Sequence, residues 1–145
     1  MPRWLRLMLR LLRGRWLPNP PPPDDGGTDD GGSDQPGSLE SAVNRYRAKH
    51  GLRPLKLSEC LRTQAAEHSA WMAGIRNLSH TGFSTRLAMC NFSGGSENVA
   101  SGYKTNADVI DGWDTSSGHR RNMQGDWTHV GGERSGTYWT LIFGR

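Results

Sequence analysis

Two histidines and one carboxylate stand out among the residues whose types could do chemistry. His80 follows a Leu-Ser pair, Glu97 opens a Glu-Asn-Val-Ala run behind two glycines, and His119 follows a Ser-Ser-Gly turn. Each lies among small or turn-forming residues, so we expect each at the end of a helix or strand, where side chains from distant segments can converge. The chain has only 5 histidines, and we interpret this grouping as one polar site.

Metal binding is the first chemistry that these three residues suggest. Two imidazoles and a carboxylate suit a borderline divalent ion such as Zn²⁺, which in an open site takes three protein ligands plus water. His80, Glu97 and His119 are therefore a candidate ligand set. The alternative is a buried hydrogen-bond network in which Glu97 accepts from an imidazole N–H and fixes the loop geometry.

Nucleophilic catalysis is less favoured by the sequence. It contains no Gly-x-Ser-x-Gly elbow, Walker loop, Cys-x-x-Cys or His-Glu-x-x-His motif. Ser79, Ser96 or Ser117 could stand beside a histidine, but serines at turns usually serve as caps and turn formers. His68 falls on the apolar stripe of an expected helix, where a hydrogen-bonded core residue is a better interpretation than a ligand.

Charge divides the chain into three zones. Residues 1–17 hold five Arg and no acid, residues 18–38 hold five Asp and no base, and the whole chain carries a formal net charge of +4. The excess of Lys and Arg over Asp and Glu within 39–145 is mild, unlike the concentrated basic footprint of nucleic-acid-binding proteins. We therefore expect no nucleic-acid partner.

The first two zones are predicted to precede the folded domain. In 1–17, arginines at helical spacing beside a leucine stripe predict a basic amphipathic segment for an anionic membrane surface, with an atypical signal or a mis-assigned start as alternatives. Residues 18–38 are rich in Pro, Asp and Gly and have too little apolar surface to offset the entropy of ordering, which predicts a disordered linker. The domain is predicted over 39–145.

Helices are predicted early in that domain and strands late. Apolar periodicity, serine caps and glycine stops predict helices over 39–50 and 58–74, and a third helix over 106–114 with Asn106 as its cap. Short β-type runs over 128–133 and 137–143, separated by an Arg-Ser-Gly turn, predict a hairpin. This order indicates an α+β layered domain.

The two cysteines leave two alternatives open. Cys60 lies in the second expected helix and Cys90 lies before the Glu97 loop. They form either one bridge that anchors a long loop or two buried free thiols. A bridge would fit a location outside the cytoplasm.

Taken together and in order, the motifs of 39–145 resemble the CAP superfamily, also called SCP-like, whose members include cysteine-rich secretory, antigen 5 and pathogenesis-related proteins. The short bacterial members are the most similar. The motifs that carry the resemblance are Asn44-x-x-Arg47, Gly51-Leu52-x-Pro54-Leu55, Ala66-x-His68-Ser69-x-x-Met72, Leu78-Ser79-His80, Arg86-Leu87, Glu97-Asn98-Val99-Ala100-x-Gly102, Trp113-x-x-Ser116-x-Gly118-His119-Arg120-x-Asn122-Met123 and Tyr138-Trp139-Thr140.

The resemblance implies an α-β-α sandwich with a small antiparallel sheet and a central cleft, where a tetrad of two histidines and two acids can bind divalent metal. His80, Glu97 and His119 match three tetrad positions. Ser116 aligns with the second acid, so the tetrad is incomplete and we expect reduced affinity for Zn²⁺ or another divalent metal. We expect Asn98 and Ser116 to line the cleft with the other three residues.

Family membership would also imply a location and a function. Members are typically secreted or surface-attached and are linked to lipid or sterol binding, so we expect a secreted, periplasmic or membrane-surface domain. Its expected function is to bind a small ligand, such as a lipid or a divalent metal, in the His/Glu-lined cleft without established catalysis. The alternative is a metal-dependent hydrolase, a peptidase or esterase, that uses the same cleft with Glu97 as base.

Overall fold

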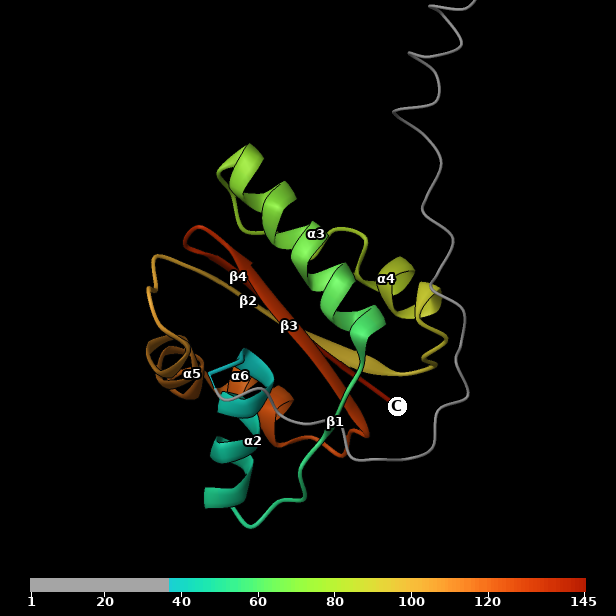
Figure 1. Ribbon diagram of the computed structural model, residues 1–145, viewed down its shortest axis with the longest axis vertical. Coiled ribbons are helices and arrows are strands. Elements are labelled where there is room, and N and C mark those ends of the chain that lie inside the picture. Colours follow the sequence, from blue (N-terminus) through green and yellow to red (C-terminus); the bar gives the residue numbers. More distant parts are fainter. Residues whose placement is uncertain (1–36) are drawn as a thin grey trace, which may run out of the picture.

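The computed structural model describes residues 37–145 (Figure 1). The predictions for 1–17, and for 18–38 except its last two residues, lie outside the described residues. In chain order the elements are α2 (Leu39–Lys49), β1 (Lys56–Leu57), α3 (Glu59–Ile75), α4 (Phe83–Met89), β2 (Gly95–Ser101), α5 (Asn106–Asp114), α6 (Ser117–Gln124), β3 (His129–Ser135) and β4 (Tyr138–Gly144).

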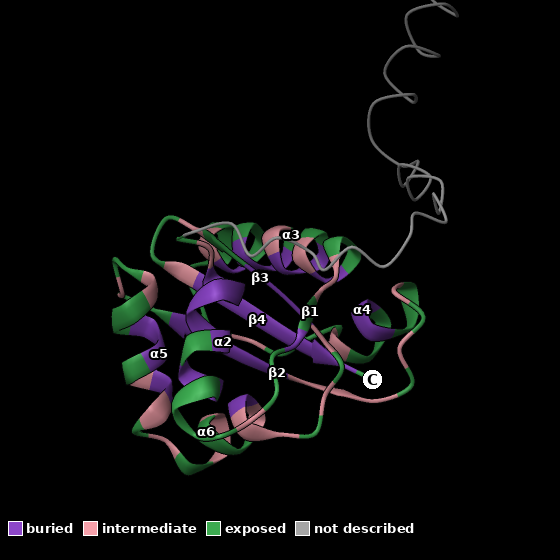
Figure 2. Ribbon diagram, turned by 60° about the horizontal axis from the view of Figure 1, so that its bottom comes forward, coloured by how far each residue is buried: buried purple, intermediate pink, exposed green. Residues whose placement is uncertain are grey.

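The four strands form one mixed sheet in the order β1-β3-β4-β2. β4 pairs antiparallel with both β3 and β2, and β1 pairs parallel with β3. Helices α3 and α4 lie on one face of this sheet, and α2, α5 and α6 cover the other (Figures 1 and 2). The expected α+β class and the α-β-α layering are therefore confirmed.

Alternation along β4 builds a core on each face of the sheet, because successive side chains of a strand point to opposite faces. Leu141 and Phe143 pack into the larger core with α2, α5 and α6, and Ile142 packs with Leu61 and Leu87 under α3 and α4. Figure 2 shows these central strands buried and the outer helix surfaces exposed. The sheet is thus a fixed platform between two helical layers.

Capping explains where three of the helices begin. The hydroxyls of Ser38, Ser58 and Thr105 each accept a hydrogen bond from the backbone N–H three residues later, at 3.1, 3.2 and 3.1 Å. The prediction of Asn106 as cap was wrong, because the Thr105 hydroxyl makes that bond and Asn106 is already helical. α3 likewise runs past Gly74 and ends at Arg76, which adopts the left-handed conformation.

The open edge of β2 is covered by side chains from α5 and α6. Trp113 donates its indole N–H to the carbonyl of Val99 at 3.1 Å, and Asn122 donates to the carbonyl of Glu97 at 3.3 Å. These bonds satisfy carbonyl groups that an edge strand would otherwise leave unpaired. As a result, α5 and α6 are held beside the middle of β2.

Gly131 of β3 allows α3 to pack directly on the sheet. A Cβ at this position would lie 2.2 Å from the backbone nitrogen of Arg62. Only a shift of the backbone of α3 or β3 could relieve so short a contact. We expect Gly131→Ala to lower the free energy of unfolding by about 3 kcal/mol through overpacking. Chemical denaturation measures this change. In the matched control Gly74→Ala the new methyl group meets no atom within 4 Å, so that variant should gain about 0.5–1 kcal/mol from helix propensity.

Cys60 in α3 and Cys90 at the end of α4 form a disulfide. Of the two alternatives left open by the sequence, the structure has the bridge. Cleavage should lower the free energy of unfolding by about 3–4 kcal/mol in the chain-entropy model, since it releases a long loop in the unfolded state. Denaturation of Cys60→Ser/Cys90→Ser against the oxidised parent checks this value. Equal midpoints and slopes for the two proteins would contradict it.

Candidate functional site

The site is built around the carboxylate of Glu97 on β2. Oε1 of Glu97 lies 2.8 Å from Nδ1 of His80, which is presented by the loop between α3 and α4. The Glu97 side chain is 1% exposed and that of His80 is 56% exposed. A buried carboxylate therefore holds one nitrogen of an exposed imidazole, and two sequence-predicted site residues are brought together.

Arg86 of α4 supplies the positive charge that this buried carboxylate needs. Its Nη2 and Nε donate to Oε2 of Glu97 at 2.6 and 3.1 Å, and its Nη1 donates to the carbonyl of Thr81 at 2.7 Å. Both oxygens of Glu97 are thus occupied. Sequence reasoning did not place Arg86 in the site, although an arginine beside a core leucine in a short apolar segment was a signal that it is buried and paired.

His68 of α3 holds the loop that carries His80 in place through a hydrogen bond. It is buried, and its Nε2 lies 2.6 Å from the carbonyl of Ser79, which requires a proton on that nitrogen. Burial lowers the pKa of His68, while the bond to Ser79 opposes this effect. His68 is therefore a hydrogen-bonded core residue, as expected, and it positions the residue that precedes His80.

His119 lies in the first turn of α6 and reaches the site from the opposite layer. Burial lowers the pKa of His119, and the charge of His80 lowers it further. The side chain of Asn98 donates to the carbonyl of His119 at 3.1 Å and accepts from Asn122 at 2.8 Å. Asn98 is fully buried and holds the turn that carries His119.

No second acid joins the site within the described residues. Ser116 is the residue that precedes α6, and its hydroxyl makes no capping bond. The neighbouring Asp114 accepts from the hydroxyl of Tyr46 at 2.6 Å, which ties α5 to α2. The structure thus gives Asp114 a contact outside the site, and the incomplete tetrad stays a prediction.

A three-ligand metal centre is not assembled in this arrangement. Residues 37–145 contain no group of three or more His, Cys, Asp or Glu side chains placed to hold one ion. Arg86 and His80 hydrogen-bond the two oxygens of Glu97, which places this carboxylate behind His80. A metal-ligand role for His80, Glu97 and His119 stays a prediction.

Two surface hollows in the described part of the chain lie away from these residues. One of about 490 Å³ includes Glu40, Arg62 and Trp139, and one of about 550 Å³ includes Tyr103 and Asp111. Neither is lined by His80, Glu97 or His119. The expected central cleft at these residues therefore remains a prediction.

Comparison with known proteins assigns the family. A family model described as the cysteine-rich secretory protein family, CAP, matches residues 40–142. The chain belongs to the CAP family. The uncharacterised protein YkwD of Bacillus subtilis is 34% identical over 111 residues, which cover 70% of this chain and 43% of that protein. The chain thus spans less than half the length of this relative.

Solved structures agree with the CAP assignment. An extracellular protein with an SCP domain from Bacillus anthracis has a TM-score of 0.70 at 25% identity, covering 74% of this chain and 39% of that one. An outer surface protein from Borrelia burgdorferi has a TM-score of 0.67 at 26% identity, covering 74% of this chain and 89% of that one. Similarity therefore extends over the layered domain that carries the site.

The Arg86–Glu97 pair makes a prediction about stability. Arg86→Met should lower the free energy of unfolding by about 3–5 kcal/mol, because it leaves a buried carboxylate without its cation. The double variant Arg86→Met/Glu97→Gln should recover part of this loss, as measured by urea denaturation.

The matched control is Arg53→Met. Arg53 pairs with Asp126 at 2.8 Å, but the two side chains are 61% and 82% exposed. Its loss should cost about 1 kcal/mol or less. A cost for Arg86→Met as small as that of the control would show that the buried pair is not what holds α4 to β2.

Proposed function

We propose that this CAP domain is an extracytoplasmic binding module in which His80 and His119 receive a small ligand. The two candidate ligand classes are a divalent metal such as Zn²⁺ and the polar group of a lipid or sterol. The observation that carries the proposal is the orientation of His80 by Glu97. Because a carboxylate accepts from Nδ1, the proton of the neutral ring sits there, and Nε2 is left as the basic nitrogen of an exposed imidazole.

The chemistry of this pair fits a weak metal site. A carboxylate behind a histidine ligand is a common outer partner, which fixes the ring and raises its basicity. The lowered pKa of His119 keeps its imidazole neutral, as a metal ligand must be. His80 and His119 would hold the ion, which would supply Lewis-acid polarisation of a bound oxygen.

Binding is favoured over hydrolysis by the state of Glu97. The metal-dependent hydrolase alternative, a peptidase or esterase, requires a base that faces a water molecule. Both oxygens of Glu97 accept hydrogen bonds from Arg86 and His80 instead. We therefore propose ligand binding without catalysis as the function of this arrangement.

An extracytoplasmic location is supported by two observations. The Cys60–Cys90 disulfide is of a kind that persists in oxidising compartments. Structural relatives are described as an extracellular protein and an outer surface protein.

Within 37–145 no helix combines the length and apolar character that crossing a membrane requires.

Zinc titration of the full chain by calorimetry tests the proposed site. We expect weak binding that His80→Ala/His119→Ala abolishes, and that Glu97→Gln reduces about 10–100-fold by removing the outer partner. Affinity should fall at acidic pH, because a protonated imidazole cannot bind metal, and burial of His119 lowers its pKa and so moves the loss of this ligand to a more acidic pH than for an ordinary histidine. Equal zinc binding by the parent and the double histidine variant would overturn the metal proposal.

A matched control removes a histidine outside the site. His129 on β3 bonds to Thr128 and packs against Phe92, so His129→Ala should leave zinc affinity unchanged. The same variants titrated with a fatty acid and a sterol test the lipid alternative. Lipid binding that survives loss of both His80 and His119 would place that ligand elsewhere.

A further inference from the structure

The exposed large apolar side chains of the described chain are concentrated in one stretch. Trp71, Ile75, Leu78 and Met89 are 44%, 47%, 42% and 56% exposed, and all four lie within residues 68–96. Large apolar groups gathered on a surface commonly mark an interaction site. The same stretch contains His80, although the site described above does not explain why these four residues are exposed.

Negative charge is absent from this stretch. Residues 68–96 contain no Asp or Glu, whereas they include Arg76 and Arg86. The next carboxylate, Glu97, is buried, and the preceding one, Glu67, lies one helical turn before Trp71. Because Arg86 is buried and paired with Glu97, Arg76 is the exposed charged residue that this stretch contributes.

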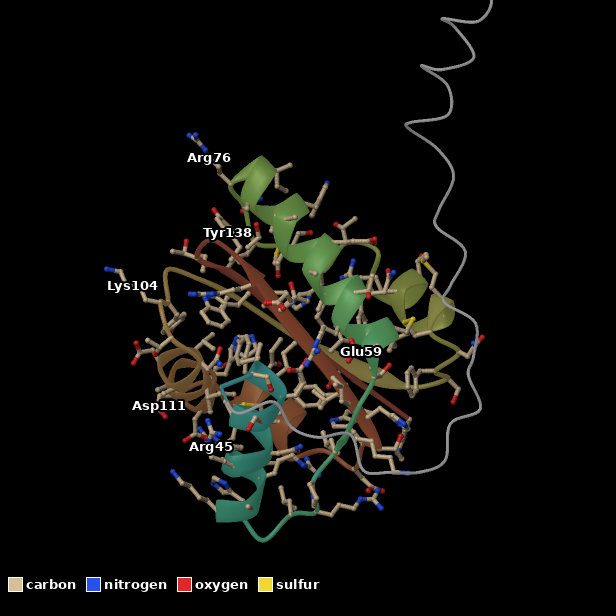
Figure 3. All side chains as sticks on the ribbon, viewed as in Figure 1. Arg45, Glu59, Arg76, Lys104, Asp111 and Tyr138 are labelled. Atoms are coloured by element: carbon tan, nitrogen blue, oxygen red, sulfur yellow. A yellow bond between two sulfur atoms is a disulfide. The ribbon has the colours of Figure 1, made fainter. Side chains whose placement is uncertain are left out.

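Three of the apolar residues lie around the C-terminal end of α3. Trp71 and Ile75 are four residues apart and share one face of the helix, and Leu78 follows Arg76, whose left-handed backbone ends the helix. We call Trp71, Ile75, Arg76 and Leu78 the α3 tip. In Figure 3, Arg76 projects outward from this end of α3.

We propose that the α3 tip docks on the surface of an anionic lipid bilayer. An indole ring with two aliphatic side chains suits the boundary between headgroups and acyl chains, and adjacent cations are attracted to anionic lipids. Neither described hollow is lined by a residue of the tip, so these side chains do not form the wall of a described pocket. Exposed apolar groups, the exposed Arg76 among them and the absence of Asp and Glu from 68–96 together favour the bilayer.

Docking in this way would bring the proposed ligand site near the membrane. Trp71 stacks on His68 with ring centroids 5.5 Å apart, and His68 bonds to the carbonyl of Ser79, next to His80. The tip and His80 are therefore connected through one buried histidine. The docking surface goes beyond the proposed function and does not depend on it.

Hydrogen exchange of the full chain with vesicles of mixed phosphatidylcholine and phosphatidylglycerol tests the proposal. Hydrogen exchange is measured separately for each segment, because residues 1–17 are themselves expected to bind such vesicles and would contribute to any measurement on the whole chain. Amides of 71–78 should become protected. In the variant Ile75→Ser/Leu78→Ser, the lipid concentration needed to protect 71–78 should rise at least about tenfold, because two apolar anchors are lost.

Met89→Ser is the matched control, since Met89 is an exposed apolar residue at the end of α4, outside the tip. It should leave protection of 71–78 unchanged, and His80→Ala/His119→Ala should do the same while losing zinc. If circular dichroism shows that the double serine variant is unfolded, Leu78→Ser alone replaces it. Protection confined to 1–17, equal protection on pure phosphatidylcholine, or protection of 71–78 unaffected by the serine variant would overturn the proposal.

Discussion

The buried ion pair between Arg86 and Glu97 is the constraint on which the site depends. A carboxylate that is 1% exposed in the middle of a strand is stable only when paired and hydrogen-bonded. Pairing with Arg86 draws α4 against β2 and leaves one carboxylate oxygen for His80. The same requirement for charge compensation thus fixes a helix, a strand and the orientation of an exposed imidazole.

The candidate site lies where two layers of the sandwich meet around the edge of the sheet. β2 is an edge strand, so a loop from the α3–α4 layer and the first turn of α6 can approach each other beside it. The Asn98 and Asn122 side chains keep α6 in place, and His68 supports the loop. His80 and His119 are therefore presented from two different layers beside the same edge strand.

Much of this arrangement could be predicted from the sequence, but its electrostatics could not. Apolar periodicity and serine caps predicted α2, α3 and the β3–β4 hairpin, because those signals are local. The short helices α4 and α6 have too few turns for periodicity to show. The hydrogen-bond partners of the two Glu97 oxygens come from other segments of the chain, so no local pattern predicts them. This is why the partner of Glu97, Arg86, was identified only in the folded chain.

The missing second acid follows from how the neighbouring residues are used. Ser116 precedes α6 without a charge, and Asp114, two residues earlier in the chain, accepts from the hydroxyl of Tyr46 between α5 and α2. Glu97, in turn, is neutralised by Arg86. In the proposed site, a ligand would meet the imidazoles of His80 and His119, and a bound metal would complete its coordination with water or with donor atoms of a second molecule. Selectivity at such a site would depend on that second molecule as much as on the protein.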